Sequence, residues 1–294
     1  MNNLMPYCLD DRYATTRSVV EMFNIGIQPS TTCGGLRAKS HGKASYPAKP
    51  LISIITPVLN GASHIEETIS SVINQRYDNI EFIVIDGCSV DGTLDILHRY
   101  DHCIDFWISE KDNGVYDAMN KGFKLATGDW MLFLGGDDLL VNCLDKVASH
   151  LMAPATIYYG DVYMPGQHSL YGGEFSAYKL MCRNIPHQAI FYPRIVGQKY
   201  CYDEQYRIVA DYELNIRCFN DPHLAFSYMP ILIAMFDDTN GLSATGKDEA
   251  FEKDKSLLLR RHFSKVNNAL FTLRHLFKDF DRNVVRPISR IFKY

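Results

Sequence analysis

The 294-residue sequence lacks several patterns that mark common classes of protein. Its eight cysteines include no C-x-x-C pair, so neither a zinc ribbon nor a dithiol redox site is indicated. A formal net charge of −4 argues against general nucleic-acid binding, which normally requires a basic excess over a whole domain. We therefore expect no nucleic-acid partner, and we expect the thiols to be reduced, as in a cytosol.

Long hydrophobic runs are also absent. The longest run, 224–236, contains a serine and a proline and is shorter than the roughly 20 residues that cross a bilayer. We interpret it as a buried strand. The first residues, MNNLMPYCLDD, show no basic stretch followed by an apolar one, so no signal peptide is expected.

The composition that is present is ordinary for a globular protein, with 47% hydrophobic and 22% charged residues. Residues 1–50 hold few apolar clusters and end in a tract rich in Gly, Ser, Lys and Pro, which indicates an N-terminal extension that ends as a loop or linker. Beyond it, apolar runs alternate with helical segments, the pattern of an α/β domain. We place this domain at 51–245, in two halves at 51–150 and 151–245, and a C-terminal helical region at 246–294.

Short apolar runs in the domain predict strands that are separated by helices. LISIITPV, IEFIVID, IDFWISE and WMLFL are rich in residues that favour strands, and the segments between them repeat apolar residues at helical spacing. Further strands are expected near 157–163 and 189–192, and further helices near 138–152 and 211–219. These features predict a Rossmann-like, mostly parallel sheet flanked by helices, with ligands beyond the carboxyl ends of its strands.

Polar residues directly follow two of these strands. Asp86 begins the segment DGCSVDGT and can accept hydrogen bonds from a base or a ribose, although a simple turn with a helix cap explains it equally well. Asp137 and Asp138 follow the fourth strand, where adjacent carboxylates favour a hard cation such as Mg²⁺ or Mn²⁺. The alternative for this pair is a helix N-cap.

Taken together, the segments TPVLN, DGCSVDGT and GGDD resemble the inverting glycosyltransferases of family two, which have a GT-A fold. The stretch EKDNGVYDAMNKG is similar to the subgroup that builds bacterial O-antigen and exopolysaccharide. The resemblance is strong over 51–151 and weaker as far as about position 243. It implies that 51–150 is a nucleotide-binding half and that 151–245 is an acceptor half.

The resemblance also implies roles for individual residues of the nucleotide half. Pro57 and Asn60 would border the nucleotide pocket, and Asp86 would recognise uracil. Asp137 and Asp138 would belong to the metal-binding motif.

In the acceptor half, the resemblance points to Asp211 as the general base, with Glu213 as the runner-up. His187, in PHQ, is either a metal or diphosphate ligand or an ordinary core or turn histidine. Lys121 ranks below the aspartates, because a lysine on a helix with an apolar face is more often solvated. The family usually has Asp or Asn where this chain has Gly135, so one contact to ribose or metal is replaced or absent.

The implied activity is transfer of a hexose, glucose or galactose, from a UDP-sugar to a polyprenyl-diphosphate-linked GlcNAc or GalNAc, with Mn²⁺ or Mg²⁺ as cofactor. A nucleotidyltransferase would be expected to have a Gly-rich, Arg-containing loop after the first strand, which TPVLNGASH does not provide. A glycoside hydrolase would leave the nucleotide-type segments without a purpose. A non-catalytic nucleotide-sugar-binding subunit stays open as an alternative, because of Gly135.

Apolar residues recur at helical spacing from Leu270 to Ile291, and Arg282, Arg286 and Arg290 form a separate stripe. This pattern predicts a basic amphipathic helix that lies on an anionic membrane surface. Packing against the domain, or against a second copy in a homo-oligomer, is the alternative. The resemblance, which implies an acceptor whose lipid stays in the bilayer, favours membrane contact. It implies a cytoplasmic enzyme, peripheral on the inner face of the bacterial cytoplasmic membrane, that serves lipopolysaccharide biosynthesis.

Overall fold

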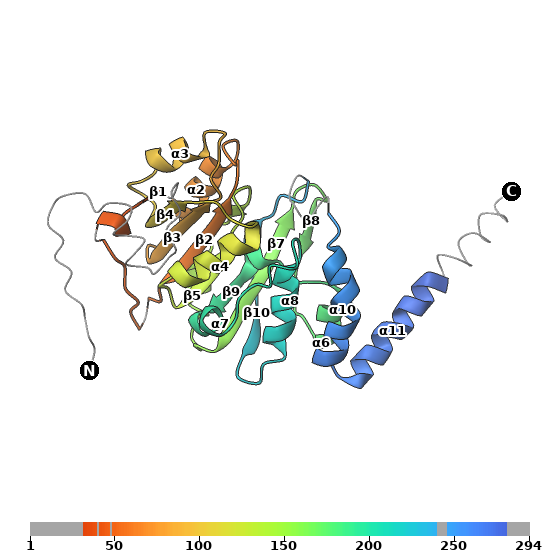
Figure 1. The fold of residues 1–294 in the computed structure, drawn as a ribbon. Helices are drawn as coiled ribbons and strands as arrows, with labels where there is room; N and C mark the ends of the chain where they lie inside the picture. The colour runs from red at the N-terminus through yellow and green to blue at the C-terminus, as the bar shows by residue number, and fades with distance from the viewer. Residues whose placement is uncertain (1–31, 40, 48, 240–245, 281–294) are drawn as a thin grey trace.

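The computed structural model describes residues 32–39, 41–47, 49–239 and 246–280. They form a sheet with helices on both faces (Figure 1). The strands are β1 (Thr32–Gly34), β2 (Ile52–Val58), β3 (Ile80–Asp86), β4 (Phe106–Ser109), β5 (Trp130–Phe133), β6 (Leu139–Leu140), β7 (Thr156–Met164), β8 (Ser169–Tyr171), β9 (Ile190–Pro193) and β10 (Ala225–Met235). The helices are η1 (Arg37–Lys39), α2 (Ile65–Ile73), α3 (Thr93–Arg99), α4 (Val115–Leu125), α5 (Leu144–Ala148), α6 (Ala177–Cys182), η2 (His187–Ala189), α7 (Arg194–Lys199), α8 (Ala210–Phe219), α10 (Glu249–His262) and α11 (Lys265–Phe280).

The strands run in the order β1-β4-β3-β2-β5-β9-β7-β10-β6, and β8 pairs with β7. Parallel pairing joins β4, β3, β2 and β5, and also joins β7 with β10. Strand β9 is antiparallel to both β5 and β7 and so links the two halves. The predicted α/β architecture with a mostly parallel sheet is confirmed. Because the strand order reverses between β2 and β5, their carboxyl ends are where a ligand crevice is expected.

Alternate residues of the central strands face two separate hydrophobic cores. On one face Ile55 and Ile83 pack beneath α4, and on the other face Ile54 and Phe82 pack beneath α2 and α3. Both faces are covered, which explains why these strands read as continuous apolar runs. Helix α4 approaches β2 closely because Gly122 has no side chain, and a Cβ there would lie 2.4 Å from Ile55 Cγ2.

The helix predicted near 138–152 is replaced by strand β6, which pairs antiparallel with β10, and by the short helix α5. The Asp138 carboxylate accepts hydrogen bonds from the backbone N–H groups of Gly135 and Asp237, at 3.0 and 3.2 Å. It therefore closes a turn and ties that turn to the chain after β10. The N-cap alternative for Asp137 and Asp138 is wrong, because no helix begins at this turn.

The apolar run 224–236 forms β10, as predicted, but the strand is only partly buried. Its pairing with β7 shifts register between Tyr228 and Leu232. Pro230 lies within this interval and has no backbone N–H to donate, so an irregularity is expected there.

Part of the N-terminal extension packs on the sheet, although its composition indicates a loop or linker. Strand β1 pairs antiparallel with β4. Basic side chains that follow β1 form ion pairs with carboxylates of the domain: Arg37 with Glu81, Lys39 with Asp101, and Lys43 with Asp105. Ion pairs hold much of this segment against the domain. The hydrophobic pattern of the sequence therefore does not indicate that the segment packs there.

Replacing Arg37 with Ala is expected to lower the free energy of unfolding by about 3 kcal/mol, because it leaves a buried carboxylate without its cation. Arg37 Nη1 lies 2.9 Å from Glu81 Oε1, and both side chains are buried. Urea unfolding followed by circular dichroism measures the change. The matched control is Lys49→Ala, since the ion pair of Lys49 with Asp78 is exposed and should contribute little. Equal effects of the two substitutions would contradict this account.

Helices α10 and α11 extend from the half formed by 151–239, at the C-terminal side (Figure 1). Helix α11 contacts α6 and α10, while Val266, Leu270 and Leu273 leave about half or more of their surface exposed, at helical spacing. These residues agree with the predicted amphipathic helix. The predicted arginine stripe and the rest of that helix, 281–294, lie outside the described residues. Within the described ranges, no helix has the length and apolar character needed to cross a bilayer.

Candidate active site

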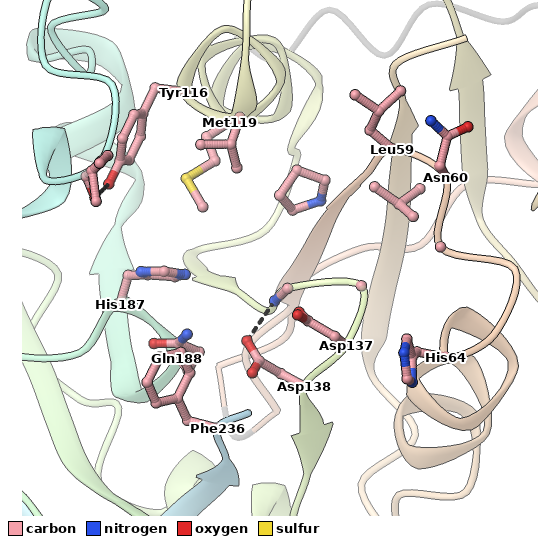
Figure 2. A pocket seen from close by; sticks show the side chains of 17 residues that line it. Leu59, Asn60, His64, Tyr116, Met119, Asp137, Asp138, His187, Gln188 and Phe236 are labelled. Atoms are coloured by element: carbon pink, nitrogen blue, oxygen red, sulfur yellow. Dashed lines mark hydrogen bonds between the residues drawn. The ribbon is translucent and has the colours of Figure 1, made fainter. Parts of the chain in front are cut away.

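A first cavity, of about 320 Å³, opens beyond the carboxyl ends of β2 and β5 (Figure 2). The last residues of β2 and the chain after it contribute Pro57 and Asn60, and the chain after β5 contributes 135–138. Tyr116 and Met119 of α4 complete one side. The cavity therefore lies where the strand order reverses, and the sequence-predicted residues of these two loops meet in it.

Asp86 lies behind the wall of the first cavity and does not line it. Its carboxylate is fully buried and accepts hydrogen bonds from the Ser89 backbone N–H and hydroxyl and, at 2.5 Å, from the Ser109 hydroxyl. The Ser89 hydroxyl in turn accepts a hydrogen bond from the Asn60 N–H at 2.7 Å, and the Asn60 side-chain oxygen accepts one from the Val90 N–H at 3.0 Å. Asp86 thus fixes the loop that carries Asn60.

Asp137 and Asp138 are neighbours in sequence with opposite environments. Both line the first cavity, but Asp137 is exposed in it whereas Asp138 is buried. Burial, together with the negative charge of Asp137, raises the pKa of Asp138 to about 6, and the neighbouring His187 opposes the shift. A cation bound beside Asp137 would relieve this repulsion.

Gly135 has a structural consequence for both aspartates. A Cβ at this position would lie 2.7 Å from Asp138 Oδ2 and 2.9 Å from Asp137 Oδ1. An Asp or Asn here would therefore require one carboxylate or both to move. The chain thus has no side chain at position 135, and Asp137 and Asp138 occupy the space that an Asp or Asn there would need.

A second cavity, of about 390 Å³, adjoins the first. The two cavities share a wall made of Tyr116, His187, Gln188, Ile208 and Phe236. Asp211 lines only the second cavity, whose other walls include the apolar side chains Val162 and Met164 and the ring of Tyr171. The predicted base and the predicted metal motif are thus on opposite sides of one wall.

Asp211 lies in the first turn of α8, and only 6% of its surface is exposed. The Tyr116 hydroxyl donates hydrogen bonds to Asp211 Oδ1 at 3.1 Å and to the Ile208 carbonyl at 2.7 Å. His187 Nδ1 lies 3.4 Å from Asp211 Oδ2. His187 therefore stands between the carboxylate of the second cavity and the aspartates of the first.

The runner-up residues lie outside both cavities. Glu213 forms an ion pair with Arg217, one turn further along α8, at 2.7 Å. Lys121 Nζ lies 2.8 Å from the Glu110 carboxylate. Neither side chain lines the space in which Asp137 or Asp211 is found.

The residues of the first cavity suit a cation that is held jointly with a nucleotide. In the described part of the chain, no three His, Cys, Asp or Glu side chains converge into a ready-made cation site. A protein that binds Mg²⁺ or Mn²⁺ together with phosphates typically supplies only one or two carboxylates. Asp137, which is exposed in the cavity, and Asp138, whose charge is destabilised, meet this condition, with His187 in the shared wall.

Three residues of the site have no counterpart in the sequence-based predictions. Tyr116 lies within the stretch that resembles the polysaccharide subgroup, which is a signal that it is near the site. His64, beside the first turn of α2, faces the first cavity in Figure 2. Asn184 precedes η2 in an irregular loop and lines the second cavity, and no pattern in the sequence indicates that it lies there.

Comparison with known proteins gives one family and one kind of fold. The sequence model described as "Glycosyl transferase family 2" matches residues 53–208. The PGL/p-HBAD biosynthesis glycosyltransferase of Mycobacterium bovis (strain BCG / Pasteur 1173P2) is 40% identical over 215 residues, which cover 70% of this chain and 84% of that protein.

Two solved structures have a similar fold. S. aureus TarS 1-349 in complex with UDP-GlcNAc matches with a TM-score of 0.58 and 16% identity, over 79% of this chain and 73% of TarS. The mannosyltransferase PcManGT from Pyrobaculum calidifontis, in complex with GDP-Man and Mn²⁺, matches with a TM-score of 0.53 and 15% identity, over 80% and 82% of the two chains. The predicted GT-A fold is confirmed by this likeness.

Proposed function

The chain belongs to glycosyl transferase family 2, and from that premise we propose that it moves glucose or galactose from a UDP-sugar to a polyprenyl-diphosphate-linked GlcNAc or GalNAc. The reaction is a metal-assisted, inverting transfer in the assembly of a bacterial surface polysaccharide such as O-antigen. The observation that carries the proposal is the shared wall, which has Asp137 in one cavity and Asp211 in the other. Two substrates that react with each other need two adjoining sites of this kind.

The first cavity is assigned to the UDP-sugar. Pro57 and Asn60 border it, and Asp86, whose carboxylate is buried, is proposed to serve uracil recognition through the loop that it fixes by way of Ser89. The complex of TarS with UDP-GlcNAc supports a UDP-sugar donor for a chain of this fold. The diphosphate would then lie at the aspartates that follow β5.

Asp137 and Asp138, with His187, are proposed to hold the Mn²⁺ or Mg²⁺. When bound, the cation would stabilise the negative charge that develops on the departing diphosphate. Asp137 has the accessible carboxylate, and Asp138 adds negative charge beneath it while it holds the turn closed. The Mn²⁺ in the PcManGT complex supports this choice of ion.

The second cavity is assigned to the sugar acceptor. Asp211 takes the proton from the acceptor hydroxyl while that oxygen attacks the anomeric carbon from the face opposite the diphosphate. The new glycosidic bond forms as the bond to the UDP oxygen breaks, so configuration inverts and no covalent enzyme intermediate is needed. The Tyr116 hydroxyl donates a hydrogen bond to Asp211 Oδ1, which leaves Oδ2 as the oxygen nearer to Asn184 and His187.

Divalent-cation binding is expected to tighten as the pH rises. Because the pKa of Asp138 is raised to about 6, its carboxyl group is mostly protonated at pH 5 and mostly charged at pH 7. A cation binds the charged form, so the affinity for Mn²⁺ should rise roughly tenfold over this interval and level off above it. Titration with Mn²⁺ alone measures the effect. Asp138→Asn should remove the pH dependence, and a flat profile in the unsubstituted protein would contradict the assignment.

We also propose that the enzyme is a cytoplasmic, peripheral membrane protein on the inner face of the membrane. Exposed Val266, Leu270 and Leu273 on α11 would enter the headgroup boundary, which brings the second cavity near a lipid-linked acceptor. Deleting 270–294 should release the protein from anionic liposomes while UDP binding is retained. The control Met152→Ser, at an exposed apolar residue outside α11, should change nothing. Unchanged sedimentation of the deletion variant would show that the membrane does not bind this helix.

The overall proposal is tested by UDP release from a panel of UDP-sugars with Mn²⁺, with and without a synthetic GlcNAc- or GalNAc-diphosphate-lipid. Turnover that depends on the acceptor supports transfer and identifies the donor. Metal-dependent UDP binding without turnover for any acceptor would favour a nucleotide-sugar-binding subunit. Absence of UDP binding would overturn the assignment of the first cavity.

A further inference from the structure

The carboxylate of Asp211 is held on both oxygens. Oδ1 accepts hydrogen bonds from the Tyr116 hydroxyl at 3.1 Å and from the Tyr212 backbone N–H at 2.9 Å. Oδ2 accepts a shorter hydrogen bond, of 2.7 Å, from the side-chain amide of Asn184, and His187 Nδ1 lies 3.4 Å away. The Asn184 amide is therefore the nearest side-chain donor to Asp211.

Behind Asn184, hydrogen bonds continue into the core. The Asn184 side-chain oxygen accepts a hydrogen bond from Asn215 Nδ2 at 2.8 Å, and Asn215 Oδ1 accepts one from the Tyr192 hydroxyl at 2.7 Å. Asn215 and Tyr192 are fully buried. We call Asn184, Asn215 and Tyr192 the amide chain; its members come from the loop before η2, from α8 and from β9.

The orientation of each amide in this chain follows from one fixed acceptor. Asn215 Nδ2 also donates to the backbone carbonyl of Ile185 at 3.2 Å, and a carbonyl can only accept. The nitrogen of Asn215 must therefore face Ile185 and Asn184, so the Asn184 oxygen faces Asn215. The Asn184 nitrogen is then left to face Asp211, where it can only donate.

We propose that the amide chain positions Asp211 as the base, with Asn184 as the residue that touches it and with Asn215 acting only through Asn184. The inference rests on the proposed function of Asp211 and adds residues for which the sequence gives no signal. A permanent donor on Oδ2 holds the carboxylate in one rotamer, with its oxygens turned toward the second cavity's wall.

The burial of Asn215 and Tyr192 argues that the amide chain is more than packing. A buried amide without partners is costly, and apolar residues of similar size would fill the same space without that requirement. Each member of the chain has a hydrogen-bond partner within it, and the chain ends on Asp211, the one carboxylate among the described residues that line the second cavity. The Tyr171 hydroxyl additionally holds the Asn184 backbone carbonyl, at 2.8 Å.

The test is a double-mutant cycle of Asn184→Ala and Asn215→Ser, read as kcat and as KM for the UDP-sugar. Each single variant should lower kcat about tenfold and leave KM for the donor unchanged. The double variant should be no worse than Asn184→Ala alone, since Asn215 acts through Asn184.

Two controls separate this positioning role from general damage. Asn220→Ala removes an amide at the exposed end of α8 and should leave kcat and KM unchanged. Asn184→Gln keeps an amide donor at this position and should recover most of the kcat that Asn184→Ala loses, which a merely structural role would not predict.

The outcomes distinguish the inference from the proposed function. Additive losses of kcat, or no recovery in Asn184→Gln, would overturn the inference, because that is the result of mere structural damage. If Asp211→Asn leaves transfer intact, the proposed base is wrong, whatever the amide chain does. If Asp211→Asn abolishes transfer and Asn184→Ala leaves kcat unchanged, only the inference fails.

Discussion

Replacing Asp211 with Asn is expected to lower kcat by about a thousandfold, the loss typical of removing a general base. The amide keeps the size of the side chain and its hydrogen bond from Tyr116, but it cannot take a proton. The affinity for UDP and Mn²⁺ should not change, because Asp211 lines the second cavity and not the first. Single-turnover transfer and isothermal titration with UDP measure the two quantities.

The matched control for this prediction is Glu213→Gln, since Glu213 lies two residues further along α8 and is the other candidate for the base. Its carboxylate pairs with Arg217 and lines neither cavity, so we expect kcat to stay within a fewfold of the unsubstituted value. Full activity of Asp211→Asn would reject the base assignment. A large loss of kcat in Glu213→Gln alone would transfer the role to that residue.

Replacing Asp137 with Asn is expected to weaken Mn²⁺-dependent UDP binding and to lower kcat/KM by about a hundredfold or more. Asp137 supplies the exposed carboxylate of the first cavity, while the oxygens of Asp138 already accept backbone hydrogen bonds. UDP titrations with and without Mn²⁺ separate the two contributions. UDP binding without metal should be nearly unaffected, or slightly stronger, because one negative charge is removed.

The control for the loss at Asp137 is Asp95→Asn, which removes an exposed carboxylate on α3, outside both cavities. It should leave binding and turnover unchanged, so that a general effect of net charge is excluded. If Asp137→Asn binds UDP with undiminished dependence on Mn²⁺, the cation is held elsewhere and the assignment of the first cavity must be revised.

The parallel half of the sheet could be predicted from the sequence because each of its strands is a continuous apolar run of neighbouring residues. Buried runs of apolar residues mark β2, β3 and β5, and parallel strands bring their carboxyl ends to one edge of the sheet. Asp137 at this edge follows from these two facts, and Pro57 and Asn60, which the family resemblance implies border the nucleotide pocket, line the same cavity. Asp86 also has its predicted place at the end of β3, although its side chain is turned inward.

The features that could not be predicted depend on residues far apart in the chain. Strand β6 forms because it pairs with β10. The residue pattern of 138–152 predicts a helix, and it contains no information about a pairing partner that lies about 95 positions further along the chain. In the same way Tyr116, Asn184 and Asp211 come from α4, a loop and α8, and they meet only after the two halves pack together. Helical or strand periodicity carries no information about such contacts between distant residues.

The short strand β1 has a consequence for how molecules of this protein behave toward one another at high concentration. Strand β4 would otherwise present an open row of backbone N–H and C=O groups, and such rows pair readily with strands of other molecules. Thr32–Gly34 occupies that row, and the ion pairs of Arg37, Lys39 and Lys43 keep it in place. A shortened version of the protein that begins near the first residue of β2 would thus be prone to aggregate, even though its substrate cavities would be complete.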